Sequence, residues 1–282
     1  MKKIDRSISN LLKTYSQVLK EHNIKSYRLD VLIFLESVTG LSRSKILSEQ
    51  YRLLKKRELK LLNLMIRRRL KKYSVAEIVQ HKEFYNRDFF VNKNVLIPRP
   101  ESETIIDHLL DISINDPVLS KKQQLNILDV GCGSGVLGIT AKLELKNANV
   151  ELIDIDKKAL KVAEVNNVLK ATKLHIYRSD LFQNVRKDFD IMLVNLPYVP
   201  DNLKHDDSIH REPVMAISGG HDGLAVYRVF FNELNKLQKK PLYLILEALD
   251  FEHQHLISLA STSGYKKAKL DNLTITFKRK AS

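Results

Sequence analysis

From residue 126 onwards, short apolar segments alternate with segments of helical periodicity, and this alternation constrains the fold more than any other feature of the chain. Short apolar runs bounded by polar and glycine-rich segments predict buried strands. The strands are predicted at 127–130, 150–153, 175–177, 189–194 and 242–246, with an edge strand at 274–277, and the helices at 136–145, 157–169 and 224–237. Strands that alternate with helices form a mostly parallel sheet with helices on both faces. The sequence therefore predicts an α/β domain.

The first 72 residues carry a different pattern, which is helical throughout. Apolar residues recur at three- and four-residue spacing over 8–19, 29–38 and 53–70, and a helix buries such a stripe against its neighbours. Gly40 closes the second of these segments, because glycine readily takes the left-handed conformation at a helix end. A small helical bundle is therefore predicted, with a short additional helix through Leu47.

Between these two regions the period shifts towards two, which is typical of strands. Aromatic and apolar residues flank the polar segment Asn86-Arg87-Asp88, and this arrangement predicts a β-hairpin. The two prolines of Ile97-Pro98-Arg99-Pro100 bias the residues before them to extended conformations, so no helix runs through this segment. We therefore expect a helical domain at 1–72, a β-hairpin linker at 73–97 and a second domain at 98–282.

The net charge of +14 is concentrated in the N-terminal part of the chain. Residues 1–80 hold 19 basic and seven acidic side chains, whereas the remaining 202 residues hold 28 and 26. A basic segment can attract polyanionic or acidic partners, and nucleic acid could contact residues 1–80 without being required for the function. A lysine-rich helical face that contacts only water is the alternative. Part of the cluster Arg67-Arg68-Arg69 also suits the negative end of a helix dipole.

Composition excludes several classes of protein. No apolar run exceeds five residues, so neither a membrane-spanning helix nor the apolar core of a secretory signal is predicted. Cys132 is the single cysteine and therefore has no internal disulfide partner, which fits a reducing compartment. We expect a cytoplasmic protein that does not contact a membrane.

A glycine-rich segment follows the first predicted strand of the α/β domain. It reads Asp129-Val130-Gly131-Cys132-Gly133-Ser134-Gly135 and stands where the strand turns into a helix. Glycines at such a turn let a ligand approach the backbone amides and the positive end of the helix. Together with Gly138 the segment also matches the dinucleotide pattern, while the Lys-Ser/Thr pair of a P-loop does not follow it. We interpret it as a loop for a nucleotide-type ligand, with a structural tight turn as the alternative.

Acidic residues follow the next two predicted strands. Asp154 lies 23 residues beyond Gly131, where an acid can accept hydrogen bonds from both ribose hydroxyls of a nucleoside. Asp156, two residues further on, is the alternative acid for this role. Asp180 could accept a hydrogen bond from an adenine amino group, or could form a turn or helix cap before Leu181. These residues do not separate NAD from S-adenosylmethionine as the ligand.

The segment Asn195-Leu196-Pro197-Tyr198 distinguishes S-adenosylmethionine from NAD as the predicted ligand. It follows the strand that ends at Val194 and therefore lies at the carboxyl edge of the sheet, where ligands bind in open α/β folds. The Asn195 side-chain oxygen and the Leu196 carbonyl can accept the two N–H bonds of a planar amino or amide group. Tyr198 offers an aromatic face to that group. An ordinary Asn-x-Pro turn is the alternative interpretation.

In combination, these segments resemble the class I S-adenosylmethionine-dependent methyltransferases, and specifically the HemK/PrmC-type release factor glutamine methyltransferases. The most specific matches are Pro-Arg-Pro-Glu at 98–101 and Gly-Gly-x-Asp-Gly-Leu at 219–224. The helical start is also similar to the N-terminal domain of that family. The other matching segments are 95–97, 102–103, 127–135, Asp154, 179–182, 195–198 and Arg211-Glu212-Pro213, with Arg28-Leu29-Asp30 and 40–43 in the helical start.

The resemblance implies a Rossmann-like class I methyltransferase sheet with helices on both faces, preceded by the helical bundle and the hairpin. It implies methyl transfer from S-adenosylmethionine to the side-chain amide nitrogen of the glutamine in the Gly-Gly-Gln motif of a peptide chain release factor. The N-terminal domain would recognise the substrate, the enzyme would be a monomer, and no metal would be needed. The implied cofactor-binding residues are Gly131, Cys132, Gly133, Ser134, Gly135, Asp154, Asp180, Leu181 and Asn195. The implied catalytic and substrate-binding residues are Asn195, Leu196, Pro197 and Tyr198.

The chain departs from the family pattern at three places. Leu196 replaces the first proline of the motif Asn-Pro-Pro-Tyr, which keeps the backbone carbonyl but loses the ring that fixes its direction. The connector shows residues 74–81 in place of Pro-x-Ala-Tyr-Ile-x-Gly. The C-terminus is shortened after Asp271, which predicts an abbreviated last hairpin.

Other functions remain open on the sequence alone. A ribosomal protein could supply the glutamine, or the same pocket could hold an amino group of adenine or cytosine in nucleic acid. A binding module that retains the cofactor pocket without catalysis is the alternative from another class. Arg99, Glu101 and Glu103 have no necessary chemical step, and we expect them to close the site or to position the seam between the domains.

Overall fold

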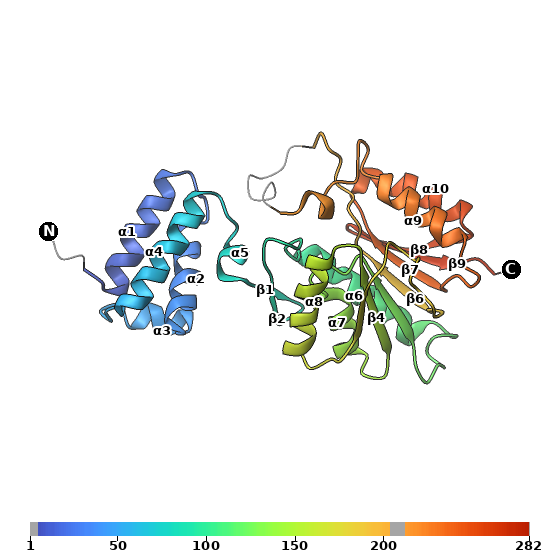
Figure 1. The fold of residues 1–282 in the computed structure, drawn as a ribbon, viewed down its shortest axis with the longest axis horizontal. Coiled ribbons are helices and arrows are strands. Elements are labelled where there is room, and N and C mark those ends of the chain that lie inside the picture. The colour runs from blue at the N-terminus through green and yellow to red at the C-terminus, as the bar shows by residue number, and fades with distance from the viewer. Residues whose placement is uncertain (1–4, 204–211, 282) are drawn as a thin grey trace. The chain divides into compact units, whose positions relative to one another are not determined.

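The computed structural model describes residues 5–203 and 212–281 (Figure 1). The chain divides into two compact units, residues 1–80 and residues 81–282. The first unit is helical, and the second contains a seven-stranded sheet with helices on both faces. No helix in the described parts of the chain is long and apolar enough to cross a membrane.

The first unit is the predicted helical bundle. Ser7 begins its first helix by accepting a hydrogen bond from the Asn10 backbone, and Gly40 ends its second helix with a φ of 69°. The apolar stripes of the helices meet in one core, in which Phe34 and Leu35 are fully buried. The helices are α1 (Ile8–Glu21), α2 (Tyr27–Thr39), α3 (Arg43–Ser48), α4 (Lys56–Leu70) and α5 (Val75–Val79).

Part of the basic cluster at the end of α4 stabilises this bundle. Arg69 Nε lies 2.6 Å from the buried carboxylate of Asp30, and Arg69 Nη1 donates to the Tyr73 carbonyl. Arg68 lies over the ring of Tyr73 and 3.6 Å from the Glu77 carboxylate. Two of the three consecutive arginines therefore have partners within the unit.

The second unit begins with an antiparallel hairpin of β1 (His81–Phe84) and β2 (Arg87–Phe90). Its two-residue turn, Tyr85-Asn86, has positive φ at both positions, as tight turns of twisted hairpins require. The fully buried side chain of Asn166 accepts from the backbone N–H of Phe90 and donates to its carbonyl. The hairpin is therefore tied to the helix that carries Asn166, α8 (Lys157–Leu169).

The sheet of the second unit has the order β5-β4-β3-β6-β7-β9-β8. Its first five members run parallel, and β9 and β8 add an antiparallel edge. The strands are β3 (Asn126–Val130), β4 (Asn149–Asp154), β5 (His175–Arg178), β6 (Ile191–Val194), β7 (Tyr243–Glu247), β8 (Tyr265–Asp271) and β9 (Thr274–Arg279). The predicted α/β architecture is confirmed.

Two cores lie on opposite faces of this sheet because successive strand residues point in opposite directions. Ile127 of β3 packs with α6 (Glu103–Asn115), α7 (Val136–Glu144) and α8, whereas Leu128 packs with α9 (Ala225–Asn235) and α10 (His253–Thr262). Figure 1 shows the two groups of helices on either side of the strands.

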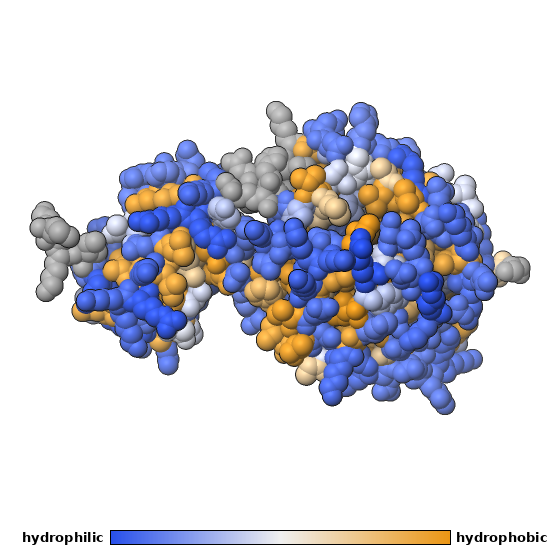
Figure 2. All heavy atoms as spheres, in the orientation of Figure 1, coloured by the Kyte–Doolittle hydropathy of each residue, from blue (hydrophilic) through white to orange (hydrophobic). Residues whose placement is uncertain are grey.

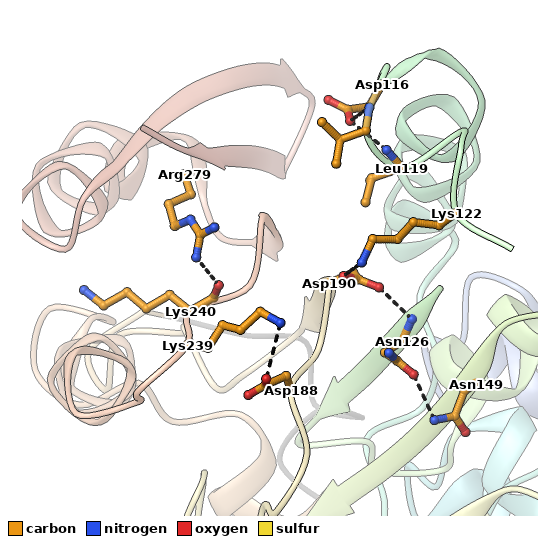
Figure 3. A network of polar contacts seen from close by, with 11 residues as sticks. Asp116, Leu119, Lys122, Asn126, Asn149, Asp188, Asp190, Lys239, Lys240 and Arg279 are labelled. Carbon is orange, nitrogen blue, oxygen red and sulfur yellow. Dashed lines mark hydrogen bonds and ion pairs between the residues drawn. The ribbon is translucent and has the colours of Figure 1, made fainter. Parts of the chain in front are cut away.

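Polar contacts join the amino ends of the central strands (Figure 3). The Asp190 carboxylate accepts from the Asn126 backbone at 3.0 Å and pairs with Lys122, and the side chains of Asn126 and Asn149 bond at 3.1 Å. These contacts align the starts of β3, β4 and β6. The opposite, carboxyl edge carries the predicted site residues.

The structure also contains elements that the sequence did not predict. Residues 75–79 form the helix α5 within the segment expected to be a linker, and α10 and β8 lie in a region without a predicted element. The expectation of an abbreviated last hairpin is wrong, because β8 and β9 pair from Tyr265 and Arg279 to Asp271 and Thr274.

Candidate active site

A cavity of about 450 Å³ lies at the carboxyl edge of the sheet, within the second unit. The segments that follow β3, β4, β5 and β6 border it, together with residues from 94–102. In the sheet, β4 and β5 extend from one side of β3, and the chain then returns to place β6 on the other side of β3. The strand order therefore reverses at β3. In open α/β sheets ligands usually bind at such a reversal. Of the predicted site residues, Gly131, Cys132, Gly133, Ser134, Asp154, Asp180, Leu181, Asn195, Leu196 and Pro197 line the cavity, while Gly135 and Tyr198 are their neighbours in the chain.

The glycine-rich loop presents backbone rather than side chains to the cavity. Gly133 has a φ of 56°, and a Cβ added there would meet no atom within 4 Å. Gly131 has a φ of 72°, and its Cβ would lie 2.8 Å from a methyl carbon of Leu196. The two loops that follow β3 and β6 therefore pack closely, and the positive φ of residue 131 favours glycine there.

Asp154 ends β4 beside this loop. Its Oδ2 accepts from the Gly133 N–H at 2.9 Å, and its Oδ1 accepts from the Asp156 N–H at 2.8 Å. Burial raises the pKa of Asp154 above its ordinary value, and these two hydrogen bonds act in the opposite direction. Asp156 itself caps α8 by accepting from the Lys158 N–H at 2.8 Å. Each Asp154 oxygen retains a lone pair for a ligand, and the two backbone hydrogen bonds fix the direction of its carboxylate, whereas Asp156 is held, among the described residues, only through the Oδ1 that caps the helix.

The loop after β5 brings Asp180 to the same cavity. Asp180 is exposed, and its neighbour Leu181 has a φ of 43°. The Ser179 hydroxyl donates to the Leu181 carbonyl at 2.6 Å and accepts from the Asn184 N–H. Ser179 therefore holds the turn, and the Asp180 carboxylate is not needed for that purpose.

Asn195 has a defined orientation at the end of β6. Its Nδ2 donates to the buried Ser102 Oγ at 3.1 Å, and no residue in the described ranges donates to its Oδ1. The next residue, Leu196, is buried, and no described donor reaches its carbonyl. Two neighbouring acceptors, one from a side chain and one from the backbone, are thus available at the cavity.

Tyr198 is held by a buried carboxylate. Its hydroxyl donates to Glu247 Oε1 at 2.6 Å, and burial together with this negative charge raises the pKa of Tyr198. Burial also raises the pKa of Glu247, against hydrogen bonds from Ser102, Tyr198 and Asn195, which lower it. Glu247 was not predicted as a site residue from the sequence. A carboxylate directly after an apolar strand, at the same edge as Asn195, was the available signal.

Comparisons with known proteins find relatives that cover most of the chain. Residues 10–79 match the family model of the PrmC N-terminal domain, and residues 115–215 match that of the Methyltransferase small domain. A release factor glutamine methyltransferase of Leptospira interrogans is 38% identical over 219 residues, 75% of each chain. Its Coxiella burnetii counterpart is 30% identical, with 93% of this chain and 92% of that protein covered, and its Bacillus subtilis counterpart is 32% identical, with 86% and 85% covered.

The chain belongs to the release factor glutamine methyltransferase family. The resemblance identified from the sequence is therefore confirmed, and the chain is a member of a methyltransferase family. The departure at Leu196 from the motif of this family has a structural counterpart. The Leu196 side chain packs against Gly131, and the Leu196 backbone lowers the pKa of the neighbouring Tyr227 hydroxyl, against burial, which raises it.

The Pro-Arg-Pro-Glu segment typical of the family is fixed by a distant glutamate. Glu212 is buried, accepts from the Ile97 N–H at 2.9 Å and pairs with Arg99 Nη2 at 2.6 Å. Glu103 accepts from the Tyr85 N–H at 2.8 Å, so it holds the hairpin turn. These contacts lie within the second unit, and Arg211 lies outside the described residues.

The Gly-Gly-x-Asp-Gly-Leu segment packs against the Asn195–Tyr198 loop. The Gly219 N–H donates to the Val199 carbonyl, and a Cβ on Gly223 would lie 2.5 Å from the Tyr198 carbonyl oxygen. The glycines therefore let this segment support the backbone of the site. Within the described residues no group of three or more His, Cys, Asp or Glu side chains could hold a metal ion.

Proposed function

We propose that this protein transfers a methyl group from S-adenosylmethionine to the side-chain amide nitrogen of the glutamine in the Gly-Gly-Gln motif of a peptide chain release factor. The observation that carries the proposal is the pair of available acceptors at Asn195 and Leu196, in a cavity of the second unit that also contains Asp154. The names of the relatives, release factor glutamine methyltransferases, support the same substrate.

The cavity residues fit a nucleoside-containing methyl donor. The Asp154 carboxylate has lone pairs for two ribose hydroxyls, and the open face of Gly133 lets the donor lie against the backbone. Asp180 accepts from the adenine amino group at the exposed rim. Val130, Ile155 and Val136 line the remaining wall with apolar surface. When bound, S-adenosylmethionine supplies a methyl group on a sulfonium centre, which is a good leaving group.

The residues after β6 must make a poor nucleophile react. An amide nitrogen is weakly nucleophilic because its lone pair is delocalised into the carbonyl. Asn195 Oδ1 and the Leu196 carbonyl accept its two N–H bonds, which raises electron density on the nitrogen and fixes the direction of its lone pair. Pro197 borders the cavity, and the Tyr198 ring, held through Glu247, packs on the planar amide. After transfer the methylated nitrogen is positively charged and strongly acidic, and it passes its proton to water, so no activated base is needed.

The first unit recognises the protein substrate in this proposal. A groove of about 390 Å³ lies among its first three helices, with Lys13, Lys20 and Arg28 among its lining residues. Figure 2 shows that hydrophilic side chains cover most of the visible face of this unit. The positive charges of Lys13, Lys20 and Arg28 attract an acidic segment of a partner protein or nucleic acid. The enzyme acts as a monomer in the cytoplasm, without contact with a membrane.

A transfer assay tests the proposal against its alternatives. The purified protein is incubated with S-adenosylmethionine labelled in the methyl group and with a release factor, a ribosomal protein or DNA in separate reactions. We expect label on the release factor, at the Gly-Gly-Gln glutamine by mass spectrometry, and none on a release factor with Ala in place of that glutamine. Transfer only to ribosomal protein or to DNA would replace the substrate, and no transfer to any of them would refute the proposed activity.

A further inference from the structure

Glu247 is a buried carboxylate beside Asn195 to which the proposed reaction gives no chemical step. It ends β7, which pairs with β6, and only 1% of its surface is exposed. Oε1 accepts from the Tyr198 hydroxyl at 2.6 Å, and the side chains of Ser102 and Asn195 lie near enough to the carboxylate to lower its pKa. Oε2 is buried and has no well-aligned donor among the described residues. The Glu247 carboxylate therefore presents an unfilled hydrogen-bond acceptor beside Asn195, and side chains that donate to it are favoured there.

Such surroundings select one orientation of the Asn195 amide. An amide group donates through Nδ2 and accepts through Oδ1, whereas an ionised carboxylate only accepts. With the amide reversed, Oδ1 would face Glu247 without a proton between them, and Nδ2 would point into the cavity. In the observed orientation Nδ2 donates to Ser102 Oγ at 3.1 Å, which leaves the Ser102 proton for the carboxylate.

We propose that Glu247 is a positioning residue that, directly and through Ser102, holds the Asn195 amide with Oδ1 towards the cavity. The inference rests on the proposed function, because it is the substrate amide that needs Oδ1 as an acceptor. The same carboxylate fixes the Tyr198 ring through its hydroxyl. One buried charge thus orients two side chains that contact the reacting group, and Glu247 itself does not touch that group.

The isosteric variant Glu247→Gln tests the inference. Glutamine keeps the shape but presents an NH₂ donor, so the two orientations of the Asn195 amide become similar in energy. We expect turnover on a Gly-Gly-Gln peptide to fall about 10- to 100-fold, as misplaced reacting groups cost rates of this order. Calorimetry should show unchanged affinity for S-adenosylmethionine and weaker affinity for the peptide. Ser102→Ala, which removes the bridge without touching the carboxylate, should lower turnover in the same direction.

Glu151→Gln is the matched control. Glu151 is also buried, with 3% exposed surface, but it lies in β4 and pairs with Lys187 away from the cavity. This variant should keep the wild-type turnover and peptide affinity. If it lowered both as much as Glu247→Gln does, the effect would be one of lost buried charge and the inference would be wrong.

A double-mutant cycle separates positioning from general damage to the site. If Glu247 acts mainly through Asn195, the loss of turnover caused by Glu247→Gln should be several-fold smaller in a protein that already carries Asn195→Ala, and the part that remains reflects the hold of Glu247 on Tyr198. If the double variant lost turnover by the product of the two single losses, the inference would be overturned. A wild-type protein that fails to methylate the peptide refutes the proposed function and the inference with it. A wild-type protein that is active while Glu247→Gln and Ser102→Ala are equally active refutes the inference alone.

Discussion

Removal of the Asp154 carboxylate should weaken the binding of S-adenosylmethionine by about 100-fold or more. Each hydrogen bond to a charged acceptor contributes about 1.5–3 kcal/mol, so the loss of two ribose contacts costs at least about 3 kcal/mol. Since about 1.4 kcal/mol is a factor of ten in affinity, Asp154→Ala should raise Kd by two orders of magnitude. The variant also frees the Gly133 N–H that Oδ2 accepts, which loosens the binding loop further.

Isothermal titration calorimetry with the Asp154 and Asp156 variants measures this effect. Asp156→Ala removes a helix cap and should lower the free energy of unfolding by about 0.5–2 kcal/mol, with Kd within about threefold of the parent. Asp154→Asn keeps one acceptor oxygen and should lie between the parent and Asp154→Ala. Unchanged affinity in Asp154→Ala, or a larger loss in Asp156→Ala, would show that the ribose hydroxyls bind elsewhere.

Three further changes test other parts of the account. Arg69→Ala leaves a buried carboxylate unpaired and should lower the unfolding free energy of the first unit by about 3–5 kcal/mol, measured by chemical denaturation; a loss below 1 kcal/mol would contradict this. Leu196→Pro removes a packed side chain and a backbone N–H, so it should lower the free energy of unfolding by about 1–3 kcal/mol. It keeps the backbone carbonyl of residue 196, so turnover should stay within a few-fold of the parent. A large loss of turnover would contradict the role of that carbonyl. Methylation of a release factor at subsaturating concentration should slow as the salt concentration rises, because salt screens charges beyond about 10 Å at 0.1 M. The combined variant Lys13→Glu, Lys20→Glu and Arg28→Glu should flatten that dependence. A rate that does not depend on salt would contradict a role for these charges.

The central sheet was predictable because its strands are buried on both faces. Such strands appear in the sequence as uninterrupted apolar runs, as in Ile191–Val194, where all four residues are buried. By contrast, β8 buries only Tyr265 of its seven residues, so neither an apolar run nor an alternating pattern marks it. The helix α5 has five residues, too few to show a helical period.

The line of site residues along the carboxyl edge was also predictable, since parallel strands bring their following loops together. Contacts between residues far apart in the sequence were not predictable. Glu212 stands 113 residues from Arg99, and Glu247 stands 49 residues from Tyr198. A single sequence contains no local pattern that pairs such residues. The basic cluster at the end of α4 illustrates the same limit, because the buried partner of Arg69 lies 39 residues earlier.

The most direct test of the proposed reaction is the turnover of Asn195→Ala on a release factor, measured together with its affinity for S-adenosylmethionine. Oδ1 of Asn195 is assigned to the reacting amide, and such a contact strengthens in the transition state. We predict a 100- to 1000-fold loss of turnover, about that of removing a comparable preorganised group, with Kd for S-adenosylmethionine within about threefold of the parent. Turnover within a few-fold of the parent, or a loss matched by an equal loss of cofactor affinity, would contradict the account.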